Sequence, residues 1–236
     1  KNMLVFAAET SCDETSICLM ENRSIIEHIT FSQEIHKIHG GVVPELASRS
    51  HLEKIQIMTN ELFSSKNIDP NEIDVFSATC GPGLIGSLLV GSTFTKSLAI
   101  SFQKPFIPIN HLEGHILSTS FNNDIKFPSL VLLLTGGHTQ VYLMKDERNI
   151  ELLGQSIDDA IGEAFDKTAK LIGLSYPGGA EIEREAVRGN ENRFILPKPL
   201  VKEKNFNFSF SGIKTHINLL TKKNKIDKKF IQDLSA

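Results

Sequence analysis

The order of apolar runs and polar turns constrains the fold of this chain more than any other feature of its sequence. Met3 to Glu9 and Ser16 to Glu21 are apolar runs of strand length separated by the polar turn TSCDET, and a third run extends from Ser24 to Ser32. A helix is predicted next, from Pro44 to Ser65. Its apolar residues at near-helical spacing are Leu52, Ile55, Ile57, Met58 and Leu62. The first part of the sequence therefore predicts three short strands followed by a helix.

Two more strands and a long helix are predicted in the middle of the chain. Val75 to Thr79 and Phe106 to Asn110 are short apolar runs of strand length. The glycine-rich turn CGPGLIGS, Cys80 to Ser87, follows the first of these runs and leads into an apolar helix. Because glycine lets another backbone or side chain approach closely, we expect this helix to pack tightly through Gly86 and Gly91.

The opening order recurs in the second half of the chain. Strands are predicted over Leu130 to Leu134, Gln140 to Met144 and Glu151 to Gln155, and a helix over Ile157 to Leu171. A repeat of hairpin, third strand and helix resembles the actin-like fold, which is a duplicated RNase-H-like α/β unit. We therefore expect an α/β protein with a first subdomain over residues 1–107. A second subdomain, with an insertion and with its C-terminal part missing, is expected over residues 108–236.

Composition and charge leave the class of protein open. The 236 residues carry a formal charge of -3, and 22% of them are charged. No stretch approaches the roughly 20 apolar residues of a membrane span, and the N-terminus turns acidic too early for a signal peptide. The three cysteines, Cys12, Cys18 and Cys80, have no metal-binding spacing, which suits a reducing compartment. We expect a cytoplasmic protein with no membrane partner.

A pair of histidines is the most informative functional feature. His111 and His115 lie four residues apart in IPINHLEGHIL, directly after a predicted strand. On a helix this spacing puts two imidazoles on one face, where they can chelate one transition metal. Two surface histidines without a ligand explain the spacing equally well. A metalloprotease would need the glutamate of HExxH, but Glu113 lies roughly 200° around the helix from His111. We interpret Glu113 as a carboxylate near a helix N-terminus.

Three loops carry chemistry of their own. Glu9 to Thr15, ETSCDET, offers hydroxyls and acids after the first strand, although a capped hairpin turn would use the same residues. The turn CGPGLIGS presents backbone N–H groups at a helix N-terminus, which is a general anion site. In LLTGGHTQ, Leu133 to Gln140, Gly136 and Gly137 would let backbone amides approach a phosphate. A hairpin with a type I′ turn explains the two glycines equally well.

Charged residues gather in two later regions. Asp158, Asp159, Glu163, Asp166 and Lys167 are predicted around one helix, either as a solvated face or as a pocket wall. Lysines collect over Lys198 to Lys204 and over Lys222 to Lys229, before and within an apparent helix that begins near Asp227. A solvated helix or loop is the usual explanation of such a run, and contact with nucleic acid is the alternative.

These segments together resemble the TsaD family of tRNA threonylcarbamoyladenosine transferases, a branch of the actin-like, Hsp70-like and sugar-kinase superfamily. The resemblance extends from Leu4 to about Phe210. Its ordered motifs are ETSCDET, GGVVPELASRSH, GPGLIGSLLVG, HLEGH, TGGHTQ, SIDDAIGEAFDKTAKLIGL, YPGG and FSFSGIKT. The family also carries an older endopeptidase name, which the position of Glu113 argues against.

The resemblance implies transfer of a threonylcarbamoyl group from threonylcarbamoyl-adenylate to N6 of adenosine 37 in tRNAs that read ANN codons. It implies one divalent metal ion, Fe²⁺ or Zn²⁺, bound by His111 and His115. It further implies that threonylcarbamoyl-adenylate or another adenine nucleotide contacts Leu133, Leu134, Thr135, Gly136, Gly137, Asp166, Gly179 and Glu183. Many members carry aspartate at the position of Glu183. Candidates for the general base are Glu9, Asp13 and His138.

The resemblance also implies partners and a longer chain. A bacterial member would work with a TsaB-like paralogue and a TsaE-like ATPase, whereas a mitochondrial member would be a homodimer in that organelle. Members normally continue for roughly another hundred residues, a stretch that carries a third metal ligand. We therefore expect this chain to be a fragment with exposed sheet edges, weak metal binding and little activity. The alternative functions are an actin-like ATPase or kinase and, less favoured, a metalloprotease.

Overall fold

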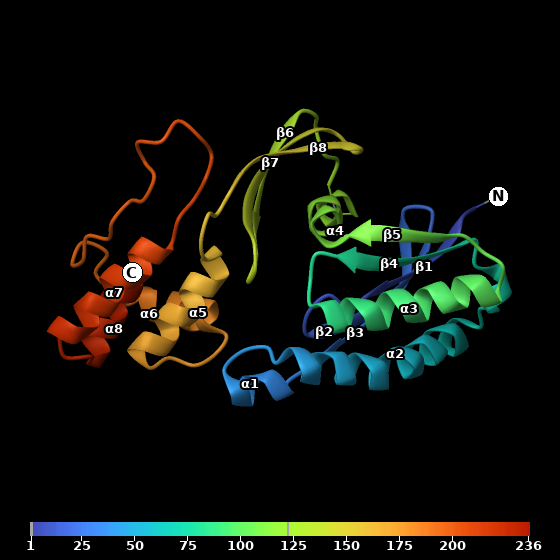
Figure 1. Cartoon of the computed structure of the whole chain (residues 1–236), viewed down its shortest axis with the longest axis horizontal. Helices are drawn as coiled ribbons and strands as arrows, with labels where there is room; N and C mark the ends of the chain where they lie inside the picture. Colours follow the sequence, from blue (N-terminus) through green and yellow to red (C-terminus); the bar gives the residue numbers. More distant parts are fainter. Residues whose placement is uncertain (1, 122) are drawn as a thin grey trace. The chain divides into compact units, whose positions relative to one another are not determined.

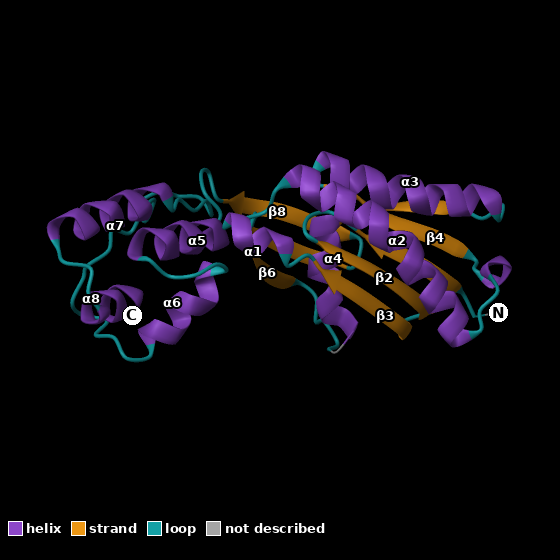
Figure 2. Ribbon diagram, turned by 90° about the horizontal axis from the view of Figure 1, so that it is seen from below, coloured by secondary structure: helices purple, strands orange, loops and turns teal. Residues whose placement is uncertain are grey.

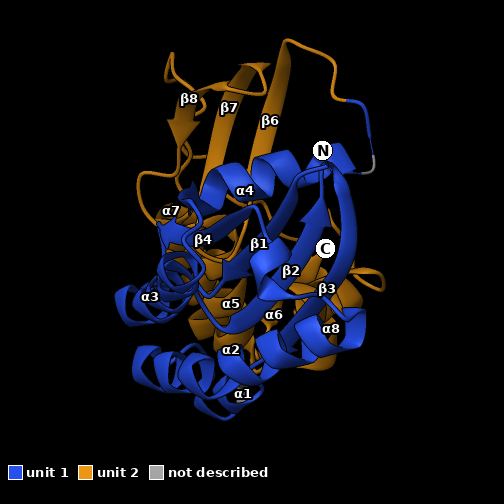
Figure 3. Ribbon diagram, turned by 90° about the vertical axis from the view of Figure 1, so that its right-hand side faces the viewer, with its two compact units in different colours: residues 1–124 blue, residues 125–236 orange. Residues whose placement is uncertain are grey.

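The computed structural model describes residues 2–121 and 123–236, and the chain divides into two compact units. The first unit is Lys1–Asp124 and the second is Ile125–Ala236 (Figure 3). Helix α4 (His111–Ser118) follows the predicted subdomain boundary after residue 107 and contacts strands of the first unit. The boundary between residues 107 and 108 stays a prediction. Each unit is described by itself below.

The first unit is built on a five-stranded sheet. Its strands are β1 (Leu4–Glu9), β2 (Glu14–Glu21), β3 (Ser24–Ser32), β4 (Val75–Gly81) and β5 (Phe106–Asn110). The order across the sheet is β3-β2-β1-β4-β5, with β1 antiparallel to β2 and parallel to β4, and with β4 parallel to β5. This is the strand order of an RNase-H-like unit. The predicted hairpin, third strand and α/β class are therefore confirmed.

Two long helices cover one face of this sheet. They are α2 (Pro44–Lys66) and α3 (Ile85–Ser101), which contact each other and the strands beneath them (Figures 1 and 2). A short helix, α1 (Ile35–His39), precedes α2, and two 3₁₀ turns, η1 (Pro70–Glu72) and η2 (Thr119–Phe121), complete the unit. Proline at the first position of α2 agrees with the predicted start of that helix, because proline has no backbone N–H to leave unpaired there.

The buried face of α2 corrects one expectation. Ile55, Met58 and Leu62 pack in the core against the sheet, whereas Leu52 and Ile57 are 68% and 61% exposed. Ile57 lies roughly 200° around the helix from Ile55, so the two side chains cannot share one face. The spacing along the sequence found the helix, but it overstated how many of its apolar residues are buried.

Helix α3 packs closely against the loop after β1 and against α2. A Cβ atom on Gly91 would lie 2.2 Å from Thr10 Oγ1, and one on Gly86 would lie 2.5 Å from Ser48 Oγ. The Thr10 hydroxyl donates a hydrogen bond of 2.7 Å to the Ser87 carbonyl. The predicted close packing at both glycines is confirmed, and it fixes the loop after β1 to the first turn of α3.

The second unit begins with a three-stranded antiparallel sheet. Its strands are β6 (Ser129–Leu134), β7 (Thr139–Asp146) and β8 (Asn149–Gln155), in the order β6-β7-β8. The pairing of β6 with β7 repeats that of β1 with β2, so the second copy of the hairpin and third strand is also confirmed. In the part of the chain that the structure describes, this second sheet has three strands where the first has five.

Helices form the rest of the second unit. They are α5 (Ile161–Ile172), α6 (Gly178–Ala186), α7 (Ser211–Lys223) and α8 (Lys228–Ser235). Their common core contains Ile172, Ile217, Phe230 and Leu234. Helix α8 begins after Asp227, whose side chain accepts a hydrogen bond from the Phe230 N–H, so the predicted start of this helix is confirmed.

Helix α5 begins four residues later than predicted. Ser156 forms a bridge with Phe208 and the Ile157 N–H donates to the Phe208 carbonyl, so the chain is still extended at this point. Asp158 and Asp159 therefore precede the helix instead of lying around it. None of the helices that the structure describes is both long and apolar enough to span a membrane.

Candidate functional site

The histidine pair lies where a strand ends and a helix begins. Strand β5 ends at Asn110 and α4 begins at His111, as the sequence predicted. The Asn110 side chain accepts hydrogen bonds from the N–H groups of Leu112 and Glu113, at 2.8 and 3.3 Å, and so caps the helix. Glu113 lies in the first turn of α4, the position where a carboxylate interacts favourably with the helix dipole.

The two imidazoles converge through their Nε2 atoms. His111 Nε2 and His115 Nε2 lie 3.1 Å apart, and the ring centroids are 4.5 Å apart. With metal–nitrogen distances of about 2.0–2.1 Å, two nitrogens at this separation would subtend roughly 100° at one ion. That angle lies between the octahedral and tetrahedral values. Within residues 2–121 and 123–236, no group of three or more His, Cys, Asp and Glu side chains could hold a metal ion.

The other nitrogen of His111 faces the loop after β1. His111 Nδ1 lies 3.2 Å from Ser11 Oγ and 3.4 Å from Glu9 Oε1, and the Ser11 N–H donates to the same Glu9 oxygen at 2.8 Å. A carboxylate only accepts hydrogen bonds, so these partners favour a proton on Nδ1 of His111. That tautomer leaves the lone pair of Nε2 available to a metal, as in other carboxylate–histidine–metal arrangements.

Glu9 stays ionised in this setting. Burial raises the pKa of the Glu9 carboxyl, but the hydrogen bonds from His111 and Ser11 outweigh burial and hold the pKa below its ordinary value. The position of Glu9 follows from the sheet: β1, β4 and β5 are parallel, so Glu9, Gly81 and Asn110 end their strands at the same edge. This edge is the usual location of functional groups in α/β folds.

The predicted anion loop Cys80 to Ser87 supports the loop after β1. The Leu84 N–H donates to the Ser11 carbonyl at 2.8 Å, and a Cβ atom on Gly83 would lie 2.6 Å from that carbonyl oxygen. Helix α3 begins after Leu84 with no side-chain cap. These contacts give Cys80 to Ser87 a structural role, and its predicted role as an anion site stays a prediction.

A buried histidine on α2 holds the same loop from another side. His51 is 0% exposed, and its Nε2 lies 3.0 Å from the Cys12 carbonyl oxygen. A carbonyl only accepts, so Nε2 of His51 carries the proton and Nδ1 accepts from the Thr15 hydroxyl, 2.7 Å away. Burial lowers the pKa of His51 below its ordinary value of 6.5. His51 is therefore a neutral imidazole with both nitrogens hydrogen-bonded.

A second histidine and a glutamine complete this buried network. The Gln33 amide nitrogen lies 3.3 Å from the Ala47 carbonyl oxygen and 3.3 Å from His51 Nδ1. His36 Nε2 donates to Gln33 Oε1 at 2.8 Å, and the Val43 N–H donates to His36 Nδ1. The Gln33 N–H donates to the Asp13 carbonyl. Sequence reasoning missed this network, although one of its residues closes the motif GGVVPELASRSH.

Two cysteines in and after the first loop, Cys12 and Cys18, have limited reactivity. Burial, together with Asp13, raises the pKa of the Cys12 thiol to about 12, and burial raises that of Cys18 to about 11. All three cysteines are free thiols. At neutral pH these two thiols are protonated, and only thiolates are good nucleophiles or metal ligands. Glu9 and Asp13 remain the candidate bases in this unit.

The glycine turn of the second unit joins β6 to β7. The Thr135 N–H donates to the His138 carbonyl, and the His138 N–H donates to Thr135 Oγ1, each at 2.9 Å. A type I′ turn requires positive φ at both central residues, and neither Gly136 nor Gly137 has it. The type I′ alternative is therefore wrong. A Cβ atom on either glycine would meet no atom within 4 Å, so the space beside the turn is open.

Helix α5 packs its N-terminus onto this turn. A Cβ atom on Gly162 would lie 2.7 Å from Gly136 Cα and from the Thr135 carbonyl oxygen, so only glycine allows this approach. The Ile161 N–H donates to Thr139 Oγ1 at 2.8 Å. The backbone of the glycine turn and the N-terminus of α5 are therefore adjacent. Leu133 is buried and Leu134 is half exposed on β6.

Asp166 connects α5 to α6. Its Oδ1 accepts a hydrogen bond of 2.7 Å from the Gly178 N–H, and a Cβ atom on Gly178 would lie 2.5 Å from Ala169 Cβ. Gly179 follows in the first turn of α6. Asp166 and Gly179, two predicted substrate contacts, are thus brought to the same helix junction. One oxygen of Asp166 is already engaged in holding that junction together.

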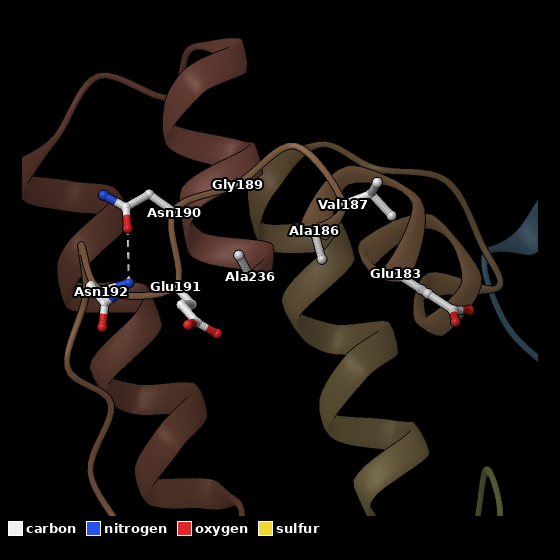
Figure 4. Close-up of a pocket in the computed structure, with 8 residues that line it drawn as sticks. All are labelled: Glu183, Ala186, Val187, Gly189, Asn190, Glu191, Asn192 and Ala236. Atoms are coloured by element: carbon white, nitrogen blue, oxygen red, sulfur yellow. Dashed lines mark hydrogen bonds between the residues drawn. The ribbon is translucent and has the colours of Figure 1, made fainter.

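Glu183 lies further along α6 in a different setting. It lines an open surface pocket of about 580 Å³ (Figure 4). The other residues around this pocket are Ala186, Val187, Gly189, Asn190, Glu191, Asn192 and Ala236. Figure 4 shows the Glu183 carboxylate directed away from the hydrogen-bonded pair Asn190 and Asn192.

The two aspartates before α5 bind side chains of the second unit. Asp158 accepts hydrogen bonds from the hydroxyls of Ser209 and Ser211 and from the N–H groups of Phe210 and Ser211. Burial raises the pKa of Asp158, but these hydrogen bonds lower it well below its ordinary value. Asp159 pairs with Lys167 and Lys214. These carboxylates fasten the start of α7, which is neither of the two roles that the sequence predicted.

Comparison with known proteins identifies relatives of the whole chain. The family model for TsaD, tRNA N6-adenosine threonylcarbamoyltransferase, matches residues 24–235. A protein of that name from Fervidobacterium nodosum is 47% identical over 241 residues, covering 99% of this chain and 72% of the relative. Those from Thermosipho melanesiensis and Wolbachia pipientis are 46% and 44% identical, with 99% and 98% of this chain covered and 72% and 70% of the relatives.

Solved structures are more distant. Component A of (R)-2-hydroxyglutaryl-CoA dehydratase from Acidaminococcus fermentans has a TM-score of 0.48 at 13% identity, covering 98% of this chain and 71% of that one. YeaZ from Pseudomonas aeruginosa has a TM-score of 0.42 at 14% identity, covering 64% of each chain. Likenesses at this level bear on neither fold nor function.

The lowered pKa of His51 predicts a pH dependence of stability. Unfolding returns His51 to its ordinary pKa of 6.5. Below that pH the unfolded chain therefore binds a proton on His51 that the folded chain does not bind. The stability contribution is complete above pH 6.5 and declines as the pH falls through the interval between the two pKa values, by up to about 1.4 kcal/mol per pH unit.

Thermal unfolding at pH values from about 7.5 to 5.5 measures this effect. Glu9, Asp13 and His36 are the ionisable groups that act on His51, and His51→Gln leaves all three in place. We expect the variant to lose less stability on acidification than the unchanged chain. Equal losses in both proteins would contradict the assignment of a neutral, buried His51.

The open space at the glycine turn predicts that a substitution there changes nucleotide affinity without changing stability. Gly137→Ala should leave the melting temperature nearly unchanged, because the added methyl group meets no atom within 4 Å. It should weaken binding of AMP or ATP by about tenfold if nucleotide approaches this backbone, which corresponds to 1.4 kcal/mol. Gly212→Ala on α7 is the matched control. Unchanged nucleotide affinity in Gly137→Ala would remove the turn from the binding site.

Proposed function

The chain belongs to the TsaD family of tRNA N6-adenosine threonylcarbamoyltransferases, enzymes that act in the modification of adenosine 37 of tRNA, and we propose that its donor substrate is threonylcarbamoyl-adenylate. The acceptors we propose are tRNAs that read ANN codons. The observation that carries this proposal is the convergence of two imidazoles, 3.1 Å apart at Nε2, with a carboxylate and a hydroxyl behind one of them. This arrangement suits a metal site at the end of a strand.

Enzymes of this family depend on a metal ion. His111 and His115 would hold that ion, since their separation fits chelation and Glu9 favours the tautomer that frees Nε2. Imidazole ligands suit Fe²⁺ and Zn²⁺ about equally. When bound, the ion would supply Lewis-acid polarisation and a template for the carbonyl or phosphoryl oxygens of the donor. Glu9 would then be an orienting group for His111 more than a free base.

The glycine turn of the second unit is proposed to hold the adenylate. Leu133 to Gly137 would surround the adenylate, and the backbone N–H groups of Gly136 and Gly137 would approach its phosphate, where they stabilise the charge that develops on the leaving group. The Thr135 N–H is already donated to the His138 carbonyl. The open space beside Gly136 and Gly137 supports this role. Asp166 and Gly179 would contact the adenosine part from the α5–α6 junction, and Glu183 would contact the ribose. Asp166 would use the oxygen that Gly178 leaves free.

The proposed reaction is an acyl transfer. N6 of adenosine attacks the carbonyl carbon of the threonylcarbamoyl group, and a carbon–nitrogen bond forms. The bond between that carbon and the phosphate oxygen breaks, so AMP leaves with the electron pair. The nucleophile loses a proton to a general base. The candidates for that base are Glu9, Asp13 and His138, of which Glu9 is less free because it is engaged by His111 and Ser11.

Partners and compartment are proposed from the family alone. A bacterial protein would pair with a TsaB-like paralogue and a TsaE-like ATPase in the cytoplasm. A mitochondrial protein would form a homodimer. The tRNA substrate follows from the family's function. The chain spans 72% of the length of the first relatives that it matches.

Transfer from preformed threonylcarbamoyl-adenylate to an unmodified ANN-decoding tRNA tests the proposal. It is measured for this chain and for the chain extended by the last part of the Fervidobacterium nodosum relative. We expect His111→Ala to reduce transfer by the extended protein at least about 100-fold, since changing only the group that orients a metal ligand already costs about 10–100-fold. His28→Ala, an exposed histidine on β3, should have no effect.

The outcomes separate the alternatives. If the extended protein transfers nothing with any partner yet hydrolyses ATP, an actin-like ATPase or kinase replaces the transferase. If the protein cleaves a protein substrate and His111→Ala abolishes this cleavage, the metalloprotease is favoured. Transfer that is indifferent to His111→Ala would exclude the histidine pair from the chemistry.

The lysine run at the end of α7 is proposed to bind the tRNA backbone. Lys222, Lys223, Lys225 and Lys228 are exposed, and among the described residues they make no ion pair. Lys229, by contrast, pairs with the buried Asp233. These four positive charges lie at the end of α7, in the following connection and at the start of α8, and they repel one another. A bound phosphate backbone would reduce that repulsion.

The salt dependence of tRNA affinity tests this surface. Changing the four lysines to glutamine should reduce the slope of log affinity against log salt by about 0.7–0.9 for each phosphate that the protein no longer neutralises. The same four positions changed to arginine should keep the slope, because the charge is kept. Changing four exposed lysines elsewhere to glutamine, Lys96, Lys126, Lys145 and Lys170, is the control for net charge. Equal slopes in all variants would make the run a solvated surface.

A further inference from the structure

We propose that His51 is a positioning residue for the histidine pair. On this account, His51 holds the loop Thr10 to Asp13 in the one placement that presents Glu9 and Ser11 to Nδ1 of His111. The inference rests on the proposed metal role of His111 and His115. It adds a residue that lies on α2, 60 positions before His111 in the sequence, and whose hydrogen bonds lead to Cys12, Thr15 and Gln33.

A short series of contacts connects His51 to the pair. His51 Nε2 donates to the Cys12 carbonyl at 3.0 Å. Cys12 follows Ser11, whose hydroxyl lies 3.2 Å from His111 Nδ1 and whose N–H donates to Glu9. The Ser11 carbonyl accepts from the Leu84 N–H at 2.8 Å. The carbonyls of the consecutive residues Ser11 and Cys12 are therefore each held by a hydrogen bond from a different segment of the chain.

His51 is itself held by polar side chains that are buried from water. Thr15 and His51 are both 0% exposed, and Gln33 and His36 are 5% and 1% exposed. These side chains come from β2, α2, the residue after β3, and α1, and they are joined to one another by hydrogen bonds. The network reaches the loop after β1 at the Cys12 and Asp13 carbonyls. A buried polar network in which every member is satisfied holds one arrangement, because a missing partner leaves a costly unpaired group.

The tautomer of His111 depends on the exact position of the loop Thr10 to Asp13. The contacts of Glu9 and Ser11 to His111 are 3.4 and 3.2 Å long, near the upper limit of useful hydrogen bonds. A shift of the loop by about 1 Å would therefore break both of them. His111 would then lose the partners that keep the proton on Nδ1, and a proton on Nε2 would block a metal there.

The apolar variant His51→Leu removes the donor and keeps much of the side-chain volume. We expect it to weaken Zn²⁺ affinity by about tenfold, the lower end of the range for groups that orient a metal ligand. His51→Gln offers an N–H close to the position of Nε2 and should restore affinity to within about threefold. Met58→Ala is the matched control, because Met58 is buried on the same helix and packs in the apolar core.

A readout independent of metal separates positioning from general stability. Nitrogen-15 chemical shifts of the His111 ring in the metal-free protein report which nitrogen carries the proton. The Nδ1–H form should dominate in the unchanged chain, in His51→Gln and in Met58→Ala, and should lose population in His51→Leu. Should His51→Leu fail to fold, Thr15→Val removes the hydroxyl that holds His51 Nδ1 and should shift the tautomer in the same direction.

The results distinguish this inference from the proposed function. If His51→Leu keeps both the Zn²⁺ affinity and the His111 tautomer of the unchanged chain, His51 is not a positioning residue. If Met58→Ala weakens affinity as much as His51→Leu does, loss of stability explains the effect and the inference also fails. If Zn²⁺ binding is indifferent to His111→Ala, the proposed metal role fails, while the tautomer measurement still decides the role of His51.

Discussion

The contact of Glu9 and Ser11 with Nδ1 of His111 is the interaction on which the rest of the first unit's site depends. Parallel pairing of β1, β4 and β5 brings the ends of these strands to one edge of the sheet, although β1 and β5 are nearly a hundred residues apart in the sequence. Because Glu9 and Ser11 engage Nδ1 of His111, its Nε2 faces His115. Fold and site are joined here: the sheet supplies the proximity, and the loop supplies the orientation.

The two units carry different groups at the same place in their repeated pattern. In each unit the first strand is followed by a loop and then by an antiparallel partner, β1 to β2 and β6 to β7. The loop of the first unit carries side-chain oxygens, whereas that of the second is a glycine turn with exposed backbone. The first kind of loop can orient a metal ligand, and the second can approach a phosphate closely. The repeated pattern thus provides two equivalent positions, one with side-chain oxygens and one with open backbone.

Much of the fold could be predicted because it rests on local patterns. Apolar runs marked the strands, and the spacing of His111 and His115 placed both on one helix after a strand. What depended on distant partners was missed. His51 reads as an ordinary helix residue, and only the fold brings it to Cys12, 39 positions away. Asp158 similarly lies before the helix that was predicted to contain it, because it is hydrogen-bonded to residues about 50 positions later in the sequence. The type I′ alternative for the turn at Gly136 was wrong, because neither Gly136 nor Gly137 has positive φ.

The central claim is that His111 and His115 bind one ion through their facing Nε2 atoms. X-ray absorption at the metal edge of the Zn²⁺- or Fe²⁺-loaded protein measures this directly. We expect two imidazole nitrogens at about 2.0–2.1 Å from the ion, and one in His115→Ala. A spectrum without imidazole scattering, or one that His115→Ala leaves unchanged, would contradict it.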